Sequence, residues 1–306
     1  MRSFRGTALA VLVAATLSAC SAASSAAGNG LPASAAATHQ GRVQVLAAES
    51  LWGDIAAQVG GTHVDVTSIL ADPNQDPHEY ESSVSDAAST SRADLVIVNG
   101  ADYDPFMDRL LGVDKKPSRT VITISTVVGA KSGNNPHLWY RPSYALRAAG
   151  AIEAALVREQ PAHRADFAAG LARFTTGMAK VNRIIATIRA LHAGAAVGYT
   201  EPVPGYLVEA AGLRLGTPKD FSLALENGTD PTPGDNARFE QSVTKGTIKA
   251  LLLNTQVTDT ETDRLQKLAL AAEVPVVRVT ETLPKGEHFQ TWQAAQATAL
   301  LGALGA

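Results

Sequence analysis

The sequence PAHRADFAAGLARFTTGMAKVNRIIATIRALH, residues 161–192, carries a single apolar stripe of unusual length. Apolar side chains recur along it at alternating spacings of four and three residues, which is the period of one face of an α-helix. They are Phe167, Leu171, Phe174, Met178, Val181, Ile185 and Ile188. Pro161 suits a first helical turn, and Gly194 lies just past the end of the stretch. The pattern therefore predicts one continuous helix over 161–192.

Short apolar runs occur on both sides of this helix, separated by stretches that are compatible with helices. Those before it are 43–50, 64–70, 94–100 and 121–124, and those after it are 195–202, 248–254 and 274–281. Strands that alternate with helices are typical of a parallel sheet covered on both faces. A helix of some 30 residues is about 45 Å long and can run along two such sheets.

We therefore expect an α/β fold of two lobes, each a parallel sheet flanked by helices, joined by one long rigid backbone helix. The expected N-terminal lobe spans 42–160, the linking helix 161–192 and the C-terminal lobe 193–306. The alternative is one long helix within a single domain. Because apolar runs of the same kind stand on both sides of the helix, the two-lobed arrangement is favoured.

The first residues have the composition of an export signal. Two arginines precede a short apolar run that ends at Leu17, too short for a transmembrane helix. We expect a signal peptide over 1–19. The sequence Leu-Ser-Ala-Cys ending at Cys20 resembles a bacterial lipobox, which predicts lipidation of this cysteine; an ordinary signal with a chance cysteine is the alternative. Residues 20–41 are then the lipidated N-terminus and a flexible tether rich in Ala, Ser and Gly.

Composition and charge restrict the class of protein. Of 306 residues, 45 % are apolar and 18 % charged, which is typical of a globular chain. The net charge of −3 becomes −5 without Arg2 and Arg5, which leaves 24 basic against 29 acidic residues. Since no stretch is strongly basic, we expect no nucleic-acid partner. Cys20 is the single cysteine, so an intramolecular disulfide is excluded.

Polar residues that could bind a ligand follow the apolar runs. Ligands of open parallel sheets bind beyond the carboxyl ends of the strands, and a cleft between two lobes is a natural place for them. Four side chains follow such runs, two in each half: His78, His137, Glu201 and Glu281. Two imidazoles and two carboxylates are a plausible ligand set for zinc or manganese, and four side chains leave little room for a reactive water. This set favours holding a metal over catalysis with it.

Each of these residues also has an ordinary explanation. A lone histidine in a loop is usually a solvated or capping residue, and a lone glutamate is usually a surface charge. A secreted metalloenzyme is a competing class. The sequence contains no H-E-x-x-H run, no G-x-S-x-G elbow and no phosphate-binding G-x-x-x-x-G-K motif. We therefore expect no enzyme.

Four segments stand out along the chain: DPHEYESS (76–83), NNPHLWYRP (134–142), GYTEPVPGYLVEAAGL (198–213) and VTETLPKGEHFQTW (279–292). In this order they resemble the corresponding segments of the cluster A-I solute-binding lipoproteins of zinc and manganese ABC transporters. The resemblance covers nearly the whole chain after the tether. It implies two lobes joined by one rigid helix, in agreement with the pattern of 161–192.

The resemblance also implies a metal site. The first two ligands of the family fall on His78 and His137, and its third, His or Glu, falls on Glu201. Its fourth ligand is normally Asp; here Glu281 stands at that position, and His288 is the alternative. Family members specific for zinc often carry a long His-rich loop, which this sequence lacks. Zinc and manganese both remain open.

The implied function is capture of Zn²⁺ or Mn²⁺ as transported cargo and delivery to an ABC importer. The implied partners are permease and ATPase subunits, and the implied state is a monomer held by its lipid anchor on the extracytoplasmic face of the cell membrane. The alternatives are a lipoprotein of the same two-lobed type that binds another ligand, and a surface adhesin.

Overall fold

The computed structural model describes residues 41–73, 75, 77–257 and 259–305. The expected signal peptide over 1–19, the lipidation site Cys20 and the expected tether up to residue 40 lie outside the described residues. Among the described residues, no helix is both long and apolar enough to cross a membrane.

The described strands form two four-stranded parallel sheets. The first has the order β2-β1-β3-β4 and the second the order β6-β5-β7-β8, so corresponding strands take the same places in both. The strands are β1 (Val43–Glu49), β2 (Val64–Leu70), β3 (Leu95–Val98), β4 (Thr120–Thr123), β5 (Ala196–Tyr199), β6 (Arg214–Leu215), β7 (Leu251–Asn254) and β8 (Val276–Val279). All residues of β3, β5 and β7 are buried, as expected of parallel strands covered on both faces.

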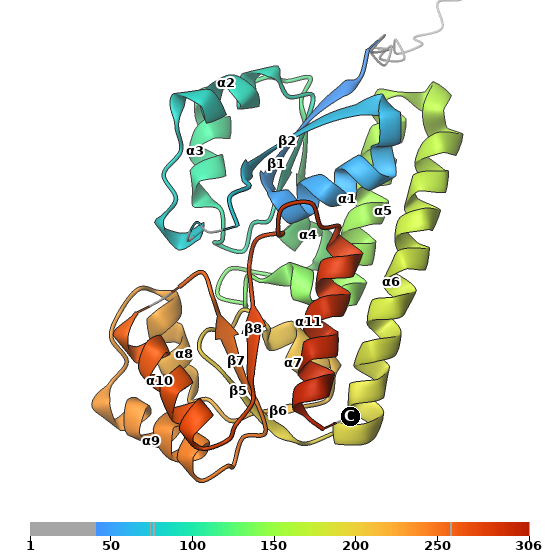
Figure 1. The fold of residues 1–306 in the computed structure, drawn as a ribbon. Helices are drawn as coiled ribbons and strands as arrows, with labels where there is room; N and C mark the ends of the chain where they lie inside the picture. The colour runs from blue at the N-terminus through green and yellow to red at the C-terminus, as the bar shows by residue number, and fades with distance from the viewer. Residues whose placement is uncertain (1–40, 74, 76, 258, 306) are drawn as a thin grey trace, which may run out of the picture. The chain divides into compact units, whose positions relative to one another are not determined.

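Helices connect the strands and cover the sheets (Figure 1). They are α1 (Ser50–Gly60), α2 (Val84–Arg92), α3 (Pro105–Val113), α4 (Ile124–Val128), α5 (Pro142–Glu159), α6 (Arg164–His192), α7 (Gly205–Ala210), α8 (Lys219–Glu226), α9 (Pro233–Thr244), α10 (Thr260–Ala271) and α11 (Phe289–Ala303). Short 3₁₀ turns lie at Gly61–His63, Pro77–Glu79, Leu138–Tyr140 and Pro161–His163. The α/β fold class predicted from the sequence is confirmed.

The predicted long helix is α6, which runs unbroken for 29 residues or about 43 Å. It begins at Arg164 rather than at Pro161, because the three residues before it form a 3₁₀ turn. Six of the seven apolar residues of the predicted stripe are buried, and Leu171 is only half-buried. Gly170, one residue before Leu171, is buried against α1. A β-carbon at this position would lie only 2.2 Å from the carbonyl oxygen of Val59 in α1. The absence of a side chain lets α6 and α1 approach closely.

Helix α11 follows the second sheet in the chain, yet it packs along α6 and touches α1 (Figure 1). The Phe289 ring lies 6.0 Å from that of Phe174 in α6, and the Phe289 backbone N–H donates to the Asp54 carboxylate in α1 at 2.8 Å. The main hydrophobic core contains residues of both sheets together with α1, α5, α6 and α11. These helices therefore form a common support that holds the two sheets together.

Candidate metal centre

The four predicted ligands lie beyond the carboxyl ends of four strands. His78 lies in the 3₁₀ turn after β2, and His137 stands in the segment that follows β4 and α4. Glu201 and Glu281 follow β5 and β8 closely. The carboxyl ends of the two sheets therefore bring residues from both halves of the chain to one place.

The structure brings these side chains together in two overlapping groups. The ligand atoms of His78, His137 and Glu281 lie within 4.8 Å of one another, and so do those of His78, Glu201 and Glu226. The Oε2 atom of Glu281 is 3.1 Å from His137 Nε2 and 3.4 Å from His78 Nε2. The side chains of His137 and Glu281 are fully buried, whereas His78 keeps 26 % of its side-chain surface exposed. His78 therefore forms the solvent side of the group.

The loop before His137 fixes which ring nitrogen faces the centre. Asn135 donates through Nδ2 to the carbonyl oxygen of Pro202 at 2.6 Å, and its Oδ1 accepts from the His137 backbone N–H at 3.0 Å. The same Oδ1 lies 2.8 Å from His137 Nδ1. Because Oδ1 can only accept, Nδ1 must carry a proton and donate it. When the ring is neutral, Nε2 is therefore the nitrogen left to bind a metal, which is the usual arrangement of a ligating histidine.

Polar groups of the second sheet hold the two carboxylates. Asn254, the last residue of β7, donates through Nδ2 to Glu201 Oε2 and to Glu281 Oε1, both at 2.7 Å. Tyr103 of the other half donates its hydroxyl to Glu281 Oε2 at 2.9 Å. Gln256 accepts at Oε1 from the Glu281 backbone N–H at 2.5 Å and donates through Nε2 to the carbonyl oxygen of Gln75 at 3.0 Å. Gln256 thereby connects the Glu281 segment to the His78 loop.

The two carboxylates have opposite electrostatic environments. Burial raises the pKa of Glu281, but hydrogen bonds and charge from His137 and His78 outweigh it and leave this pKa well below its usual value. Burial raises the pKa of Glu201 to about 8, and repulsion from Glu281 and Glu226 adds to this, against the hydrogen bond from Asn254. In the absence of a cation, Glu281 is therefore ionised and Glu201 is protonated at neutral pH.

Glu226 was not predicted from the sequence. It is the last residue of α8, and its Oε1 lies 3.6 Å from His137 Nε2. The reasoning from strand ends could not find it, because it comes from a helix. Asn254 and Asn135 could have been found: the first ends an apolar run, and the second stands two residues before His137.

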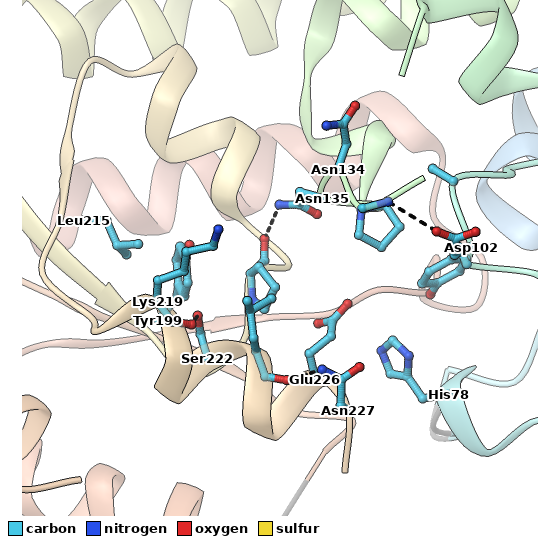
Figure 2. A pocket seen from close by; sticks show the side chains of 16 residues that line it. His78, Asp102, Asn134, Asn135, Tyr199, Leu215, Lys219, Ser222, Glu226 and Asn227 are labelled. Carbon is cyan, nitrogen blue, oxygen red and sulfur yellow. Dashed lines mark hydrogen bonds between the residues drawn. The ribbon is translucent and has the colours of Figure 1, made fainter. Parts of the chain in front are cut away.

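Two cavities adjoin the group. One of about 600 Å³ is lined by His78, Tyr103, Asn135 and Glu226, among others, and Figure 2 shows Glu226 and His78 directed toward the same part of it. Another of about 830 Å³ is lined by His78, Glu226 and Gln256, among others. His78, Glu226 and Asn227 line both cavities, so an ion that enters from solvent meets these side chains.

His288, the alternative fourth ligand, lies elsewhere. It precedes α11, its Nδ1 is 2.8 Å from Asp54 Oδ1, and its side chain is 67 % exposed. A further group of possible ligands consists of His63, His163 and Asp166. The two rings are stacked with centroids 3.8 Å apart, and His63 Nε2 is 3.1 Å from Asp166 Oδ2. This group lies at the ends of α1 and α6, away from the four predicted ligands in the fold.

Comparison with known proteins identifies relatives of one kind. The sequence model of the family described as zinc-uptake complex component A, periplasmic (ZnuA), matches residues 45–303. The manganese-binding lipoprotein MntA of Bacillus subtilis is 31 % identical over 133 residues, which are 41 % of this chain and 43 % of the relative. The manganese ABC transporter substrate-binding lipoprotein PsaA of Streptococcus anginosus is 26 % identical over 160 residues, 48 % of this chain and 52 % of the relative. The matches span about half the length of these curated relatives.

Solved structures show the same fold along nearly their whole length. The periplasmic zinc-binding protein TroA of Treponema pallidum superposes with a TM-score of 0.72 at 16 % identity, covering 87 % of this chain and 100 % of TroA. A manganese-bound mutant of a periplasmic metal-binding protein from Candidatus Liberibacter asiaticus gives 0.71 at 18 % identity, covering 86 % and 99 %. The two-lobed arrangement around one long helix is therefore shared with these proteins.

Proposed function

The chain belongs to the zinc-uptake component A family, and from this premise we propose that it captures a divalent transition-metal ion outside the cytoplasm and delivers it to an ABC importer. The ion is cargo, and the family is one of uptake-complex components rather than of enzymes. The observation that carries the proposal is the convergence of two imidazoles and several carboxylates at the carboxyl ends of both sheets.

The proposed ligands are His78, His137, Glu201 and Glu281. In support, the Glu281 oxygen already lies within 3.4 Å of Nε2 of both imidazoles, and Asn254 connects Glu281 to Glu201. Small movements of these side chains would bring all four to the distances of about 2.0–2.2 Å typical of zinc. A bound cation would also favour the ionised form of Glu201, so binding would release its proton.

The proposed place of action is the extracytoplasmic face of the cell membrane, with the lipid on Cys20 as anchor and the tether over 20–41 as spacer. The printed names of the relatives support this, since MntA and PsaA are called lipoproteins. Substrate-binding proteins of ABC importers work with permease and ATPase subunits, which are the proposed partners. The proposed state is a monomer with an N-terminal lobe over 42–160, a linking helix over 161–192 and a C-terminal lobe over 193–306.

Titration of the metal-free chain with Zn²⁺ and with Mn²⁺ tests the proposal. Calorimetry should give one tight site per chain, and the metal should raise the melting temperature, because it binds the folded protein and not the unfolded chain. The group of His63, His163 and Asp166 could add a weaker site, so the variant His163→Gln is titrated in parallel. The tight site should persist in His163→Gln and disappear in His137→Ala. A chain that binds neither metal would refute the proposed function.

A further inference from the structure

The position of Glu226 carries an inference about the kind of metal, which rests on the proposed function. Its carboxylate comes from the last residue of α8, and 11 % of its side chain is exposed. One of its oxygens lies 3.6 Å from His137 Nε2. A carboxylate oxygen of Glu226 also lies within 4.8 Å of a ring nitrogen of His78 and of a carboxylate oxygen of Glu201. Figure 2 shows its carboxylate directed into the pocket toward His78. Glu226 thus occupies the same centre as the four proposed ligands.

Helix α8 itself gives no reason for a glutamate at this place. The carboxyl end of a helix carries a partial negative charge, so an acidic side chain there is unfavourable. The helix ends instead through the backbone N–H groups of Asn227 and Gly228, which bond to carbonyl oxygens of the last turn, with Gly228 at a φ of 63°. A neutral side chain would serve the helix better than Glu226 does.

Glu226 also adds a third carboxylate to the centre. Glu226, Glu201 and Glu281 bring three carboxylates to two imidazoles, and like charges at such distances repel. A divalent cation among them reverses this repulsion, because each carboxylate can then bind it. The arrangement is therefore explained by a cation that uses Glu226 as well.

A fifth side chain changes which metal the site suits. Zinc in proteins is usually held by four ligands in a tetrahedron, and two imidazoles with two carboxylates already supply four. Manganese(II) prefers oxygen ligands and higher coordination numbers. We propose that Glu226 is a fifth metal ligand and that the site is built for a metal such as Mn²⁺, which takes five or more donors rich in oxygen.

A fifth ligand at Glu226 would change the ratio of the affinities for Mn²⁺ and Zn²⁺. For any fixed set of ligands zinc binds more tightly than manganese, and Glu226 does not reverse that order. It raises the affinity for manganese more than the affinity for zinc, because manganese gains more than zinc does from a fifth donor. Removing the Glu226 carboxylate should therefore widen the gap between the two metals.

The test compares Glu226→Gln with the parent and with Asp220→Asn, which removes the same charge from the exposed first turn of the same helix. Dissociation constants of the full chain for Mn²⁺ and Zn²⁺ are measured by competition with a chelator of known affinity. Glu226→Gln should lose at least about tenfold in manganese affinity, because loss of even a residue that only supports a ligand typically lowers metal affinity by about 10–100-fold. It should lose less than about threefold in zinc affinity. Asp220→Asn should match the parent for both metals.

Several outcomes separate the possible failures. Unchanged manganese affinity in Glu226→Gln would show that Glu226 is no ligand, and an equal loss for both metals would show that it acts only through its charge. Either result overturns this inference while leaving metal capture intact. A parent chain that binds neither metal would overturn the proposed function itself. The melting temperature of the metal-free Glu226→Gln chain shows that it folds, and X-ray absorption of the manganese-loaded parent should count five or six nitrogen and oxygen donors.

Discussion

His137 Nε2 and Glu281 Oε2 lie 3.1 Å apart, although one residue follows the first sheet and the other follows the second. Both side chains are fully buried, so this contact connects the two halves of the chain on the side of the centre that is away from solvent. A metal bound by both residues would take over the same connection.

Replacement of His137 should therefore act on affinity and on stability. His137→Ala should lower the affinity for metal more than about 100-fold. This loss exceeds the roughly 10–100-fold that is typical when a residue that only hydrogen-bonds to a ligand is replaced. It also removes the buried partner of an ionised Glu281, which should cost the metal-free chain about 3–5 kcal/mol of unfolding free energy. His78→Ala should lower affinity comparably with a smaller loss of stability, because His78 is partly exposed. Calorimetry and urea unfolding of both variants check this.

The parts of this site that were predictable share one property: they follow strands. The carboxyl ends of parallel strands meet at one edge, so an apolar run followed by a histidine or glutamate placed His78, His137, Glu201 and Glu281 in one region. Glu226 escaped this reasoning, because a glutamate at the end of a helix is indistinguishable in sequence from a surface charge.

The fold was predictable where an apolar repeat continued over many residues. The alternation of four and three residues indicated α6 almost to its ends, whereas the 3₁₀ turn at Pro161–His163 leaves no distinct period. Gly170 was not predicted as a contact, since its importance comes from the backbone of α1, which is distant in sequence. The return of α11 to α6 likewise depends on packing and not on local pattern.

The unfolding free energy of the metal-free chain should fall as the pH rises from 5 to 8. Burial, with Glu281 and Glu226 as neighbours, raises the pKa of Glu201 from 4.5 to about 8. Between these values the folded chain holds a proton that the unfolded chain has lost, so stability declines by up to about 1.4 kcal/mol per pH unit. Glu281 itself stays ionised over this range, because its pKa lies well below the usual value.

Glu201→Gln isolates this contribution. Glutamine cannot ionise, so the variant should lose less stability than the parent between pH 5 and pH 8 when both are unfolded with urea in the presence of a chelator. Equal slopes for the parent and the variant would contradict the assignment of a protonated Glu201.

The close approach of α6 to α1 gives a pair of opposite glycine replacements. Gly170→Ala would place a β-carbon 2.2 Å from the Val59 carbonyl oxygen, and since backbone cannot move aside freely, a loss of about 1–3 kcal/mol is expected. Gly150→Ala in α5 meets nothing within 4 Å and should stabilise the chain by about 0.4–1 kcal/mol. Denaturant midpoints measure both. A neutral Gly170→Ala would contradict the packing of these helices.

Cys20→Ser tests the proposed anchor in cells. If Cys20 carries the lipid, the variant should leave the membrane fraction or remain unprocessed, while its affinity for metal stays that of the parent. Fractionation followed by immunoblotting, with mass spectrometry of the N-terminal peptide, measures both processing and lipidation. Retention of Cys20→Ser in the membrane at the parent level, with normal processing, would exclude the lipobox interpretation.

Two glutamine replacements, Glu281→Gln and His288→Gln, test which of these two residues is the fourth ligand. In Glu281→Gln the amide keeps the size of the side chain but loses the charge. Glu281 Oε2 accepts from Tyr103 and Oε1 from Asn254, so one end of the glutamine must place its NH₂ group against a donor. We expect the affinity for Mn²⁺ and Zn²⁺ to fall more than about tenfold.

His288→Gln should leave the affinity within about twofold of the parent, because its ring is 67 % exposed and faces Asp54. It should instead cost a few tenths of a kcal/mol through the lost Asp54 contact, since exposed pairs contribute about 0–1 kcal/mol. Glu281→Gln is thus expected to lower the affinity for metal, whereas His288→Gln is expected to lower only the stability. A larger loss of affinity in His288→Gln than in Glu281→Gln would move the fourth ligand to the start of α11, which the distance between His137 and Glu281 argues against.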